Sequence, residues 1–157
     1  MDAAMRVVRY LKGSLGNGVA FRQNGNLEIQ GYTYADWVGN SNDRRSTSGY
    51  FTMVGGNLVT WRSKKQKVVA LSSAKAEFRG IARGLTEILW FRKLMAEIGF
   101  PHTGACRLLC DNKATISISK NPVQHDRTKH VEVDRHFIKE KLEDGLIELL
   151  FVRSKIS

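Results

Sequence analysis

The sequence predicts a mixed α/β domain built around one β-sheet, and three observations lead to that prediction. Hairpin turns are indicated at Asn24-Gly25 and at Gly55-Gly56-Asn57, each between two short apolar runs. A long stretch from Ala74 then carries an apolar residue at every third or fourth position, which is the helical period. Short apolar runs at 106–110 and 146–152 enclose two further helical segments. The predicted order is therefore three antiparallel strands, a helix, a strand, two helices and a last strand.

The N-terminal elements are a short helix and the first hairpin. Apolar residues at helical spacing predict the helix over residues 3–12, and a glycine-rich break over 13–18 ends it. A strand at 19–21 follows, and then a first core strand that starts at Leu27 and ends at Asp36. The first hairpin turn joins these two strands.

The second hairpin joins strands predicted at 49–54 and 58–61, and residues 68–71 are predicted to continue a strand after a basic turn. Two serines before Ala74 can cap the long helix, which the segment 99–101 stops. The remaining predicted elements are helices at 112–120 and 130–143 and the last strand at 146–152.

Composition narrows the class of protein. Apolar residues make up 42% of the 157 residues, which suffices for one domain with a buried core. No apolar run approaches the ~20 residues that span a bilayer, and the N-terminus has no signal-peptide pattern, so no membrane partner is expected. Cys106 and Cys110 fit neither a zinc site nor a disulfide framework, and they are interpreted as reduced strand residues of an intracellular protein.

The net charge of +10, with a pI near 9.9, indicates a polyanion as partner, although a basic surface that only keeps the protein soluble is the alternative. Basic residues gather in two clusters that are expected to contact the phosphates of a nucleic acid, with RNA 2′-hydroxyl contacts giving discrimination. The clusters are Arg44 with Arg45, and Arg62, Lys64, Lys65 and Lys67 next to Trp61. A third group, within residues 127–141, is equally consistent with a solvated helix face.

Three carboxylates stand at strand ends or helix starts. Asp36 ends the first core strand, Glu77 lies in the first turn of the long helix, and Asp111 follows the strand at 106–110. Each is also explained as a cap or turn residue, and periodicity does not determine the strand order. If the three converge, they form an oxygen-donor site for hard cations such as Mg²⁺ or Mn²⁺. Two such ions, ~3.5–4 Å apart, activate water and stabilise the leaving oxygen in phosphodiester cleavage.

The histidines are not expected to be metal ligands, because neutral imidazole prefers softer ions than these acids would hold. His125, in a predicted loop, is a candidate proton shuttle to the leaving group, whereas His130 is explained by the start of a helix. Trp37, Trp61 and Trp90 are predicted to pack in the core or at its rim.

Six sequence blocks resemble, in the same order, the signature blocks of the ribonuclease H region in copia-type retrotransposon polyproteins. They are Gly31–Trp37, Asp43–Gly49, Trp61–Gln66, Leu71–Phe78, Cys110–Asn112 and Arg127–His130. The segment Ala3–Gly13 resembles the stretch that joins the reverse transcriptase to that region. The resemblance covers almost the whole chain.

This resemblance implies the ribonuclease H-like fold, an α/β fold with a five-stranded mixed β-sheet flanked by helices. It implies that residues 1–24 form a connecting segment, with the short helix and the first hairpin strand, and that 25–157 form the ribonuclease H-like domain. Asp36, Glu77 and Asp111 match the family's first three metal-binding acids. Two Mg²⁺ ions, with Mn²⁺ as a substitute, are then expected as cofactors.

The implied function is cleavage of the RNA strand of RNA–DNA hybrids during reverse transcription, by two-metal-ion hydrolysis. The implied partners are the RNA–DNA hybrid and the reverse transcriptase domain of the same polyprotein. The implied location is the cytoplasm, inside a virus-like particle, or the nucleus.

The chain also departs from the family pattern. The family has a fourth metal-binding aspartate after the last strand, and the chain ends at Ser157 before such a block, so the domain is expected to be truncated before its last helix. Asp134 and Asp144 are possible substitutes, and both precede the last strand. The family often carries an acid at the position of Tyr34, but Asp36 is taken as the match to the metal ligand.

Three hypotheses remain open from the sequence. The first is a metal-dependent endoribonuclease that acts on RNA–DNA hybrids. The second is a catalytically weak or inactive domain that still binds nucleic acid, because it lacks the fourth acid. The third is a structural module that supports a polymerase domain. Little cleavage with Mg²⁺, some cleavage with Mn²⁺ and nearly intact hybrid binding are expected.

Overall fold

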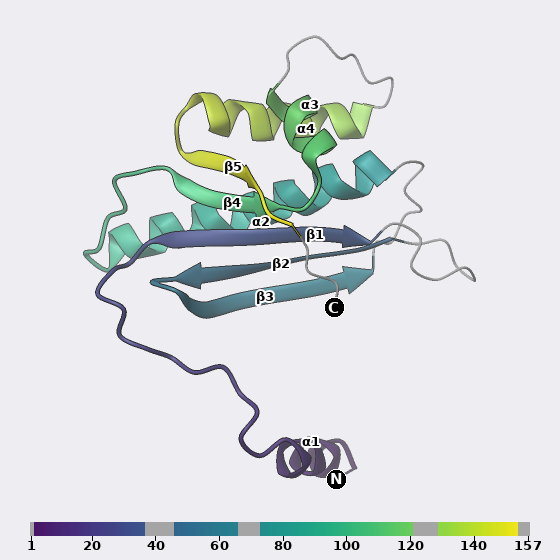
Figure 1. Cartoon of the computed structure of the whole chain (residues 1–157), viewed down its shortest axis with the longest axis vertical. Helices are drawn as coiled ribbons and strands as arrows, with labels where there is room; N and C mark the ends of the chain where they lie inside the picture. The colour runs from purple at the N-terminus through teal and green to yellow at the C-terminus, as the bar shows by residue number, and fades with distance from the viewer. Residues whose placement is uncertain (1, 37–45, 66–72, 121–128, 154–157) are drawn as a thin grey trace.

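One five-stranded sheet forms the centre of the molecule (Figure 1). Its strands are β1 (Ile29–Asp36), β2 (Thr47–Val54), β3 (Asn57–Lys65), β4 (Cys106–Cys110) and β5 (Ile147–Phe151). They lie in the order β3-β2-β1-β4-β5; β1 to β3 are antiparallel, whereas β4 pairs parallel with β1 and with β5. The computed structural model describes residues 2–36, 46–65, 73–120 and 129–153. The predicted mixed five-stranded sheet is confirmed.

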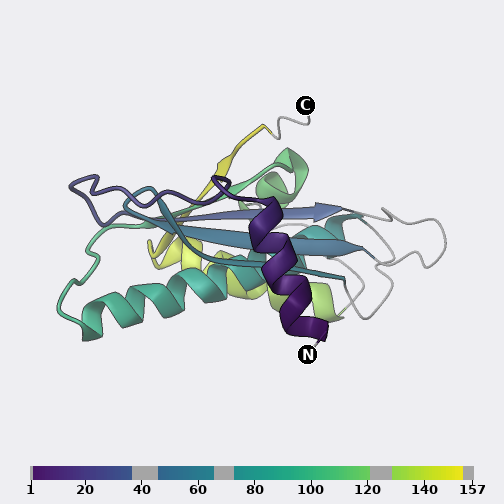
Figure 2. The same ribbon diagram turned by 90° about the horizontal axis from the view of Figure 1, so that it is seen from below.

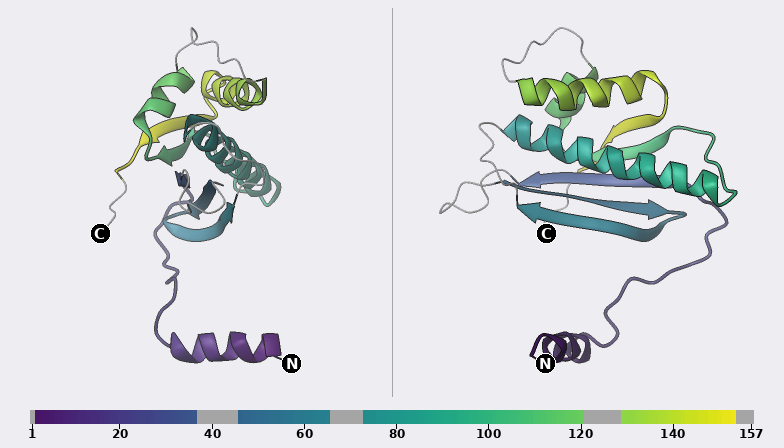
Figure 3. Two further views of the ribbon diagram at one scale, coloured as in Figure 1. Left: turned by 90° about the vertical axis from the view of Figure 1, so that its right-hand side faces the viewer. Right: turned by 180° about the vertical axis from the view of Figure 1, so that it is seen from behind.

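The helices of the described ranges are α1 (Asp2–Gly13), α2 (Ser73–Glu97), α3 (Lys113–Lys120) and α4 (Lys129–Glu143). α2 lies along one face of β1 and β2, α4 packs against α2, and α3 contacts both α4 and β5 (Figure 3). All four were predicted in this order, with ends that differ by one or two residues. No helix in the part of the chain described here combines the length and the apolar character needed to cross a membrane.

α2 is held on the sheet by an apolar stripe along one side. Ile81, Leu85 and Ile88 are fully buried and recur at the three- and four-residue spacing of one helix face. They belong to one core cluster with Leu108 of β4. Burying a side chain of this size stabilises a fold by roughly 1.5–3 kcal/mol. This packing fixes the position of Glu77 near the start of α2.

Two glycines of α2 face the neighbouring strands. A Cβ atom at Gly84 would overlap the γ-methyl group of Thr33, a stiff β-branched side chain. A Cβ atom at Gly80 would make only ordinary contacts, the nearest at 3.5 Å to the carbonyl oxygen of Tyr34. The close approach of α2 to β1 therefore depends on Gly84 and not on Gly80.

We expect opposite effects from alanine at these two positions. Gly84→Ala should destabilise the protein by about 1–2 kcal/mol, because overpacking outweighs the gain in helix propensity. Gly80→Ala should stabilise it by roughly 0.5–1 kcal/mol, because there only the gain remains. Chemical denaturation of both variants against the wild type measures the two changes. A Gly84→Ala variant as stable as Gly80→Ala would contradict this account of the packing.

The strand predicted at 19–21 is wrong, because the structure has no helix or strand over residues 17–28. The side-chain amide of Asn57 accepts a hydrogen bond from the backbone N–H of Arg22 and donates one to its carbonyl, both at 2.8 Å. One side chain thus satisfies backbone groups that a paired strand would otherwise engage. The apolar side chains of Val19 and Phe21 remain exposed.

β3 is longer than predicted, since it continues past Trp61 to Lys65. Its last residues are charged or polar but pair fully with β2, from Thr47 opposite Lys65 onward. Charged residues suit an outer strand, whose free edge faces solvent. The strand predicted at 68–71 lies outside the described residues.

α1 stands apart from the sheet in Figures 1 and 3, and seen from below it runs across the direction of the strands (Figure 2). None of its residues is buried. Met5, Val8 and Leu11, whose spacing predicted the helix, are 49%, 55% and 58% exposed. The helix therefore forms without a packing partner among the described residues.

Candidate functional site

The parallel pairing of β1 with β4 brings two strand ends to one edge of the sheet. The register pairs Thr33 with Cys110, and the hydroxyl of Thr33 donates a hydrogen bond to the carbonyl oxygen of Leu109 at 3.4 Å. Asp111 follows β4 directly, and Asp36 is the last residue of β1. The topology that periodicity left undetermined therefore directs both predicted acids to this edge.

Glu77 and Asp111 lie together at this edge. Glu77 comes from α2 and is only 8% exposed, whereas Asp111 is half-buried. The ligand atoms of Glu77, Asp111 and Cys110 all lie within 4.8 Å of one another. Within the described ranges this is the one cluster of three such side chains, and neither Asp134 nor Asp144 belongs to it.

The environment of Glu77 disfavours its charge. Burial, followed by repulsion from the Asp111 carboxylate, raises the pKa of Glu77 to about 7, although a hydrogen bond from Asn112 acts in the opposite direction. Asn112 is itself held in place, because its side-chain oxygen accepts a hydrogen bond from the N–H of Thr115 at 3.0 Å and caps α3. The pair therefore holds a shared excess of negative charge that a cation would relieve.

The donor chemistry of the cluster fits a hard divalent cation. Burial raises the pKa of the Cys110 thiol to about 11, so this group stays protonated at neutral pH and offers no thiolate to a soft metal. The two carboxylates supply the oxygen ligands that Mg²⁺ and Mn²⁺ prefer. The place of Cys110 against the acids was not predicted from the sequence, although its position directly before Asp111 was a signal.

The structure does not bring Asp36 level with Asp111. Extending the register beyond Thr33 and Cys110 sets Tyr34 beside Asp111, and Asp36 lies two residues, or about 7 Å, further along β1. The side chain of Asp36 lies outside the described part of the structure, whereas its backbone pairs with Thr47. Convergence of Asp36 with the other two acids thus stays a prediction.

Tyr34 lies on the face of the sheet opposite to α2. Its ring covers Gly49 of β2, where a Cβ atom would overlap it. On the same face the rings of Tyr32 and Phe51 stack with centroids 4.5 Å apart. Trp61 follows in register beside Phe51 and is 71% exposed, which excludes the core and leaves the rim of the two places predicted for it. No helix of the described residues covers that face of β3.

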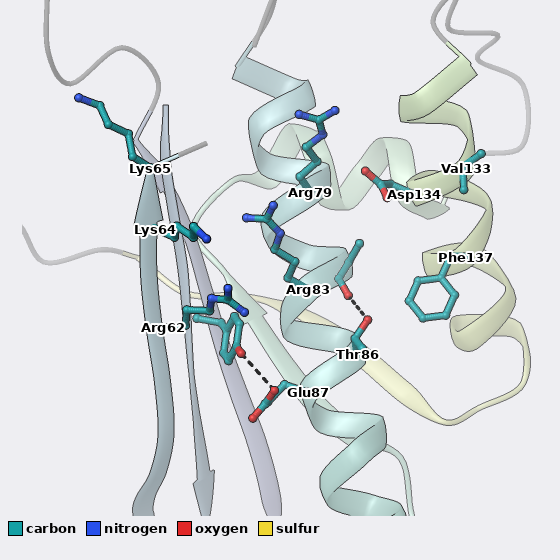
Figure 4. A pocket seen from close by; sticks show the side chains of 12 residues that line it. Arg62, Lys64, Lys65, Arg79, Arg83, Thr86, Glu87, Val133, Asp134 and Phe137 are labelled. Carbon is teal, nitrogen blue, oxygen red and sulfur yellow. Dashed lines mark hydrogen bonds between the residues drawn. The ribbon is translucent and has the colours of Figure 1, made fainter. Parts of the chain in front are cut away.

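The basic residues of β3 line a groove between β3, α2 and α4 with a volume of about 870 Å³ (Figure 4). Arg62, Lys64 and Lys65, predicted to bind nucleic acid, lie on its strand side. Arg79 and Arg83 of α2 line it too, although neither was predicted from the sequence. Their spacing of four residues on a long helix was the signal available.

Several predicted residues lie outside the described part of the chain: Trp37, Arg44, Arg45, Lys67 and His125. His130 lies in the first turn of α4, as predicted. Asp134 lines the groove from α4, and Asp144 accepts a hydrogen bond from Lys141 at 3.4 Å just after that helix. Neither arrangement places a fourth acid beside Glu77.

The chain matches no established protein-family model. It is 36% identical to the retrovirus-related Pol polyprotein from transposon RE1 of Arabidopsis thaliana, over 97% of the chain and 10% of that protein. It is 34% identical to the corresponding polyprotein from transposon TNT 1-94 of Nicotiana tabacum, over 95% of the chain and 11% of that protein. The chain therefore spans about a tenth of the length of these relatives.

Solved structures share the arrangement of strands and helices. The crystal structure of LC11-RNase H1 in complex with an RNA/DNA hybrid aligns with a TM-score of 0.53 at 17% identity, over 81% of the chain and 85% of that protein. The foamy viral protease-reverse transcriptase in complex with an RNA/DNA hybrid aligns with a TM-score of 0.56 at 12% identity, over 90% of the chain and 19% of that protein. At such identities the likeness concerns the fold.

Proposed function

This chain belongs to the retrovirus-related Pol polyproteins of copia-type transposons and has the ribonuclease H-like fold, and on that premise we propose that it hydrolyses the RNA strand of RNA–DNA hybrids with divalent metal ions. The observation that carries the proposal is the close pair of Glu77, which is buried, and Asp111, which is half-buried, at the edge shared by β1 and β4. Two neighbouring carboxylates removed from water are costly unless a cation or a proton joins them.

Glu77 and Asp111 would hold the metal, and Asp36 is the proposed third carboxylate. When bound, such ions lower the pKa of a water nucleophile and stabilise the leaving oxygen of the phosphodiester, with Mg²⁺ as the expected ion and Mn²⁺ as its substitute. Glu77 must release its proton to become a ligand, since its pKa of about 7 leaves it partly protonated at neutral pH. The Cys110 thiol, within 4.8 Å of both acids, keeps its proton because burial raises its pKa to about 11.

The basic residues would hold the substrate. Arg62, Lys64 and Lys65 are proposed to contact phosphates of the hybrid, together with Arg44, Arg45 and Lys67. His125 is the proposed proton shuttle to the leaving oxygen. Complexes with RNA/DNA hybrids among the structural neighbours support the choice of substrate.

Residues 1–24 are proposed as a connecting segment ahead of the ribonuclease H-like domain. The uncovered apolar side of α1, with no buried residue, supports this assignment. The reverse transcriptase of the same polyprotein is the proposed neighbour, and an intracellular place of action is proposed from the nature of the relatives.

A weak or inactive domain that binds hybrids is the second candidate. The observation that favours it is Tyr34, whose backbone stands level with Asp111 when the register is extended by one residue, so that β1 carries no carboxylate at the level of the acid pair. A site with fewer carboxylates retains Mg²⁺ poorly, because this ion gives up its water reluctantly.

A cleavage assay separates the two candidates. We expect the chain to cut a hybrid labelled on its RNA strand, more strongly with Mn²⁺ than with Mg²⁺, and to leave the DNA strand and single-stranded RNA intact. Binding of the same hybrid in EDTA is measured in parallel. Hybrid binding without cleavage in either ion would favour the second candidate, and absence of both would overturn the proposed function.

A further inference from the structure

The groove of Figure 4 has two basic walls that face each other. Arg62 and Lys64 alternate along β3 and therefore point to the same side, about 7 Å apart along the strand. Arg79 and Arg83 lie one turn apart on α2, a rise of about 6 Å, and Arg83 points across the groove toward Lys64. The two rows thus repeat at similar spacing on either side of one channel.

Acidic residues do not neutralise this channel. Five basic and two acidic side chains line it. Glu87 accepts a hydrogen bond from the hydroxyl of Tyr50 at 3.1 Å, at one end of the groove. Asp134 lies on the α4 side, across from Arg79. The guanidinium group of Arg83 donates a long hydrogen bond to the Ser48 hydroxyl at 3.4 Å. The excess of positive charge therefore faces an open space.

The groove also has an aromatic side. Phe137 of α4 is half-buried, and its ring faces the groove (Figure 4). Val133 lines the same wall one helical turn away and is 67% exposed. Positive charge on one side and an aromatic ring on the other is the combination that binds single-stranded nucleic acids, where phosphates meet the cations and a base stacks on the ring.

This groove is separate from the acid pair. At 3.6 residues per turn, Arg79 and Arg83 lie about 200° and 240° around α2 from Glu77. Glu77 turns toward Asp111 and β4, whereas the arginines turn toward β3 and α4. A strand in the groove would therefore lie away from the candidate metal centre and would not be the strand that is cut.

We propose that the groove between β3, α2 and α4 binds one strand of nucleic acid, with its phosphates between Arg62 and Lys64 on one wall and Arg79 and Arg83 on the other. The proposal rests on the proposed nucleic-acid function and adds to it a site in which an unpaired strand meets the same β3 residues that are proposed to contact the hybrid. A duplex carries its phosphates on the outside of a broad cylinder, so it can touch the β3 wall from outside, whereas only a single strand can enter between the two walls.

The test measures binding of a fluorescent oligothymidylate to the full chain by anisotropy, in EDTA so that the metal centre takes no part. Arg79→Gln with Arg83→Gln is compared with Lys93→Gln with Lys120→Gln, which removes the same charge from exposed positions outside the groove. We expect only the groove variant to weaken binding. Its plot of log affinity against log salt should become shallower by about 1.4, the value for two lost phosphate contacts on a single strand.

Two competitors and one modified ligand sharpen the result. An oligonucleotide with abasic sites is expected to bind roughly fivefold more weakly or worse, since it cannot stack on Phe137. Equal competition by a mononucleotide would make the groove a small-ligand site, and equal competition by polyglutamate would make it a plain polyanion surface. Either result would overturn the proposal, as would equal salt slopes for the two double variants.

The outcome is independent of the nuclease proposal. Glu77→Gln is expected to leave binding of the single strand unchanged, because Glu77 lies on another side of α2. A wild type that binds the single strand in the groove but cleaves no hybrid would count against the nuclease proposal alone. A wild type that cleaves the hybrid, with a groove variant that binds the single strand as tightly as the wild type, would count against the groove proposal alone.

Discussion

Replacing Glu77 by glutamine is expected to lower metal-dependent cleavage and at the same time to stabilise the metal-free protein. Cleavage should fall on the order of 100-fold or more, because loss even of a group behind a metal ligand costs roughly 10–100-fold in affinity or activity. Stability at pH 8 should rise by up to about 3 kcal/mol, because glutamine removes a buried charge whose pKa stands at about 7 instead of the usual 4.5.

The sign of the pH dependence follows from the raised pKa. Between pH 4.5 and about 7 the folded protein holds the Glu77 proton that the unfolded chain has lost. The contribution of Glu77 to stability is therefore fully present below pH 4.5, falls as the pH rises toward 7 and is constant above it. A bound divalent cation should reverse this pH dependence of stability, since it binds the ionised acid pair and displaces the proton of Glu77.

Denaturation in EDTA at pH 5.5 and pH 8 tests this reading of Glu77. The wild type should lose stability between the two pH values relative to Glu77→Gln. Glu148→Gln, at an exposed position of β5, serves as the control and should follow the wild type. If the stability of the wild type and that of Glu77→Gln depend on pH in the same way, burial and the nearby Asp111 do not raise the pKa of Glu77 as described.

Introducing aspartate at position 34 is expected to raise the affinity for Mn²⁺ roughly tenfold or more, because affinity for such ions follows the number of charged oxygen ligands. Extended by one residue, the register of β1 and β4 sets the backbone of this position beside that of Asp111, at the end of the paired strands. Tyr34→Asn, which removes the ring without adding charge, is the matched control. Calorimetric titration with Mn²⁺ measures the difference.

The same titration decides what Asp36 does. If Asp36 completes the site, Asp36→Asn should weaken Mn²⁺ binding about as much as Tyr34→Asp strengthens it. If only a carboxylate level with Asp111 can reach the metal, Asp36→Asn should leave the affinity for Mn²⁺ unchanged. A Tyr34→Asp variant that binds no more tightly than Tyr34→Asn would mean that a carboxylate at position 34 does not reach the metal held by the acid pair.

The elements with strong periodicity could be predicted from the sequence, and the contacts between them could not. The buried apolar stripe of α2 follows from the three- and four-residue spacing of its apolar side chains. The turn predicted at Gly55-Gly56 is confirmed, because both glycines have a positive φ. The strand predicted around Val19 and Phe21 does not form, because local alternation of apolar residues does not show whether a neighbouring strand is available for pairing. The side chain of Asn57 bonds the backbone of Arg22 instead, and a contact of this kind leaves no periodic pattern in the sequence.

The candidate site divides in the same way. The residue types and their strand-end positions indicated Glu77 and Asp111, whereas the shared edge depends on a parallel pairing that local sequence does not encode. Arg79 and Arg83 were not predicted, because a pair of basic residues on a helix usually faces solvent. They become part of a groove only because β3 and α4 lie on either side of them.

The parallel pairing of β1 with β4 has a consequence for the order in which the chain folds. β1, β2 and β3 are joined by neighbouring segments and can pair early, whereas the contact between Thr33 and Leu109 closes a separation of 76 residues. Closing so long a loop has a large entropic cost and slows the step that makes it. The acid pair is assembled only in that late step, so its mutual repulsion is absent while the hairpins form. A nascent chain that has not yet released β4 from the ribosome accordingly has a meander and a helix but no acid pair.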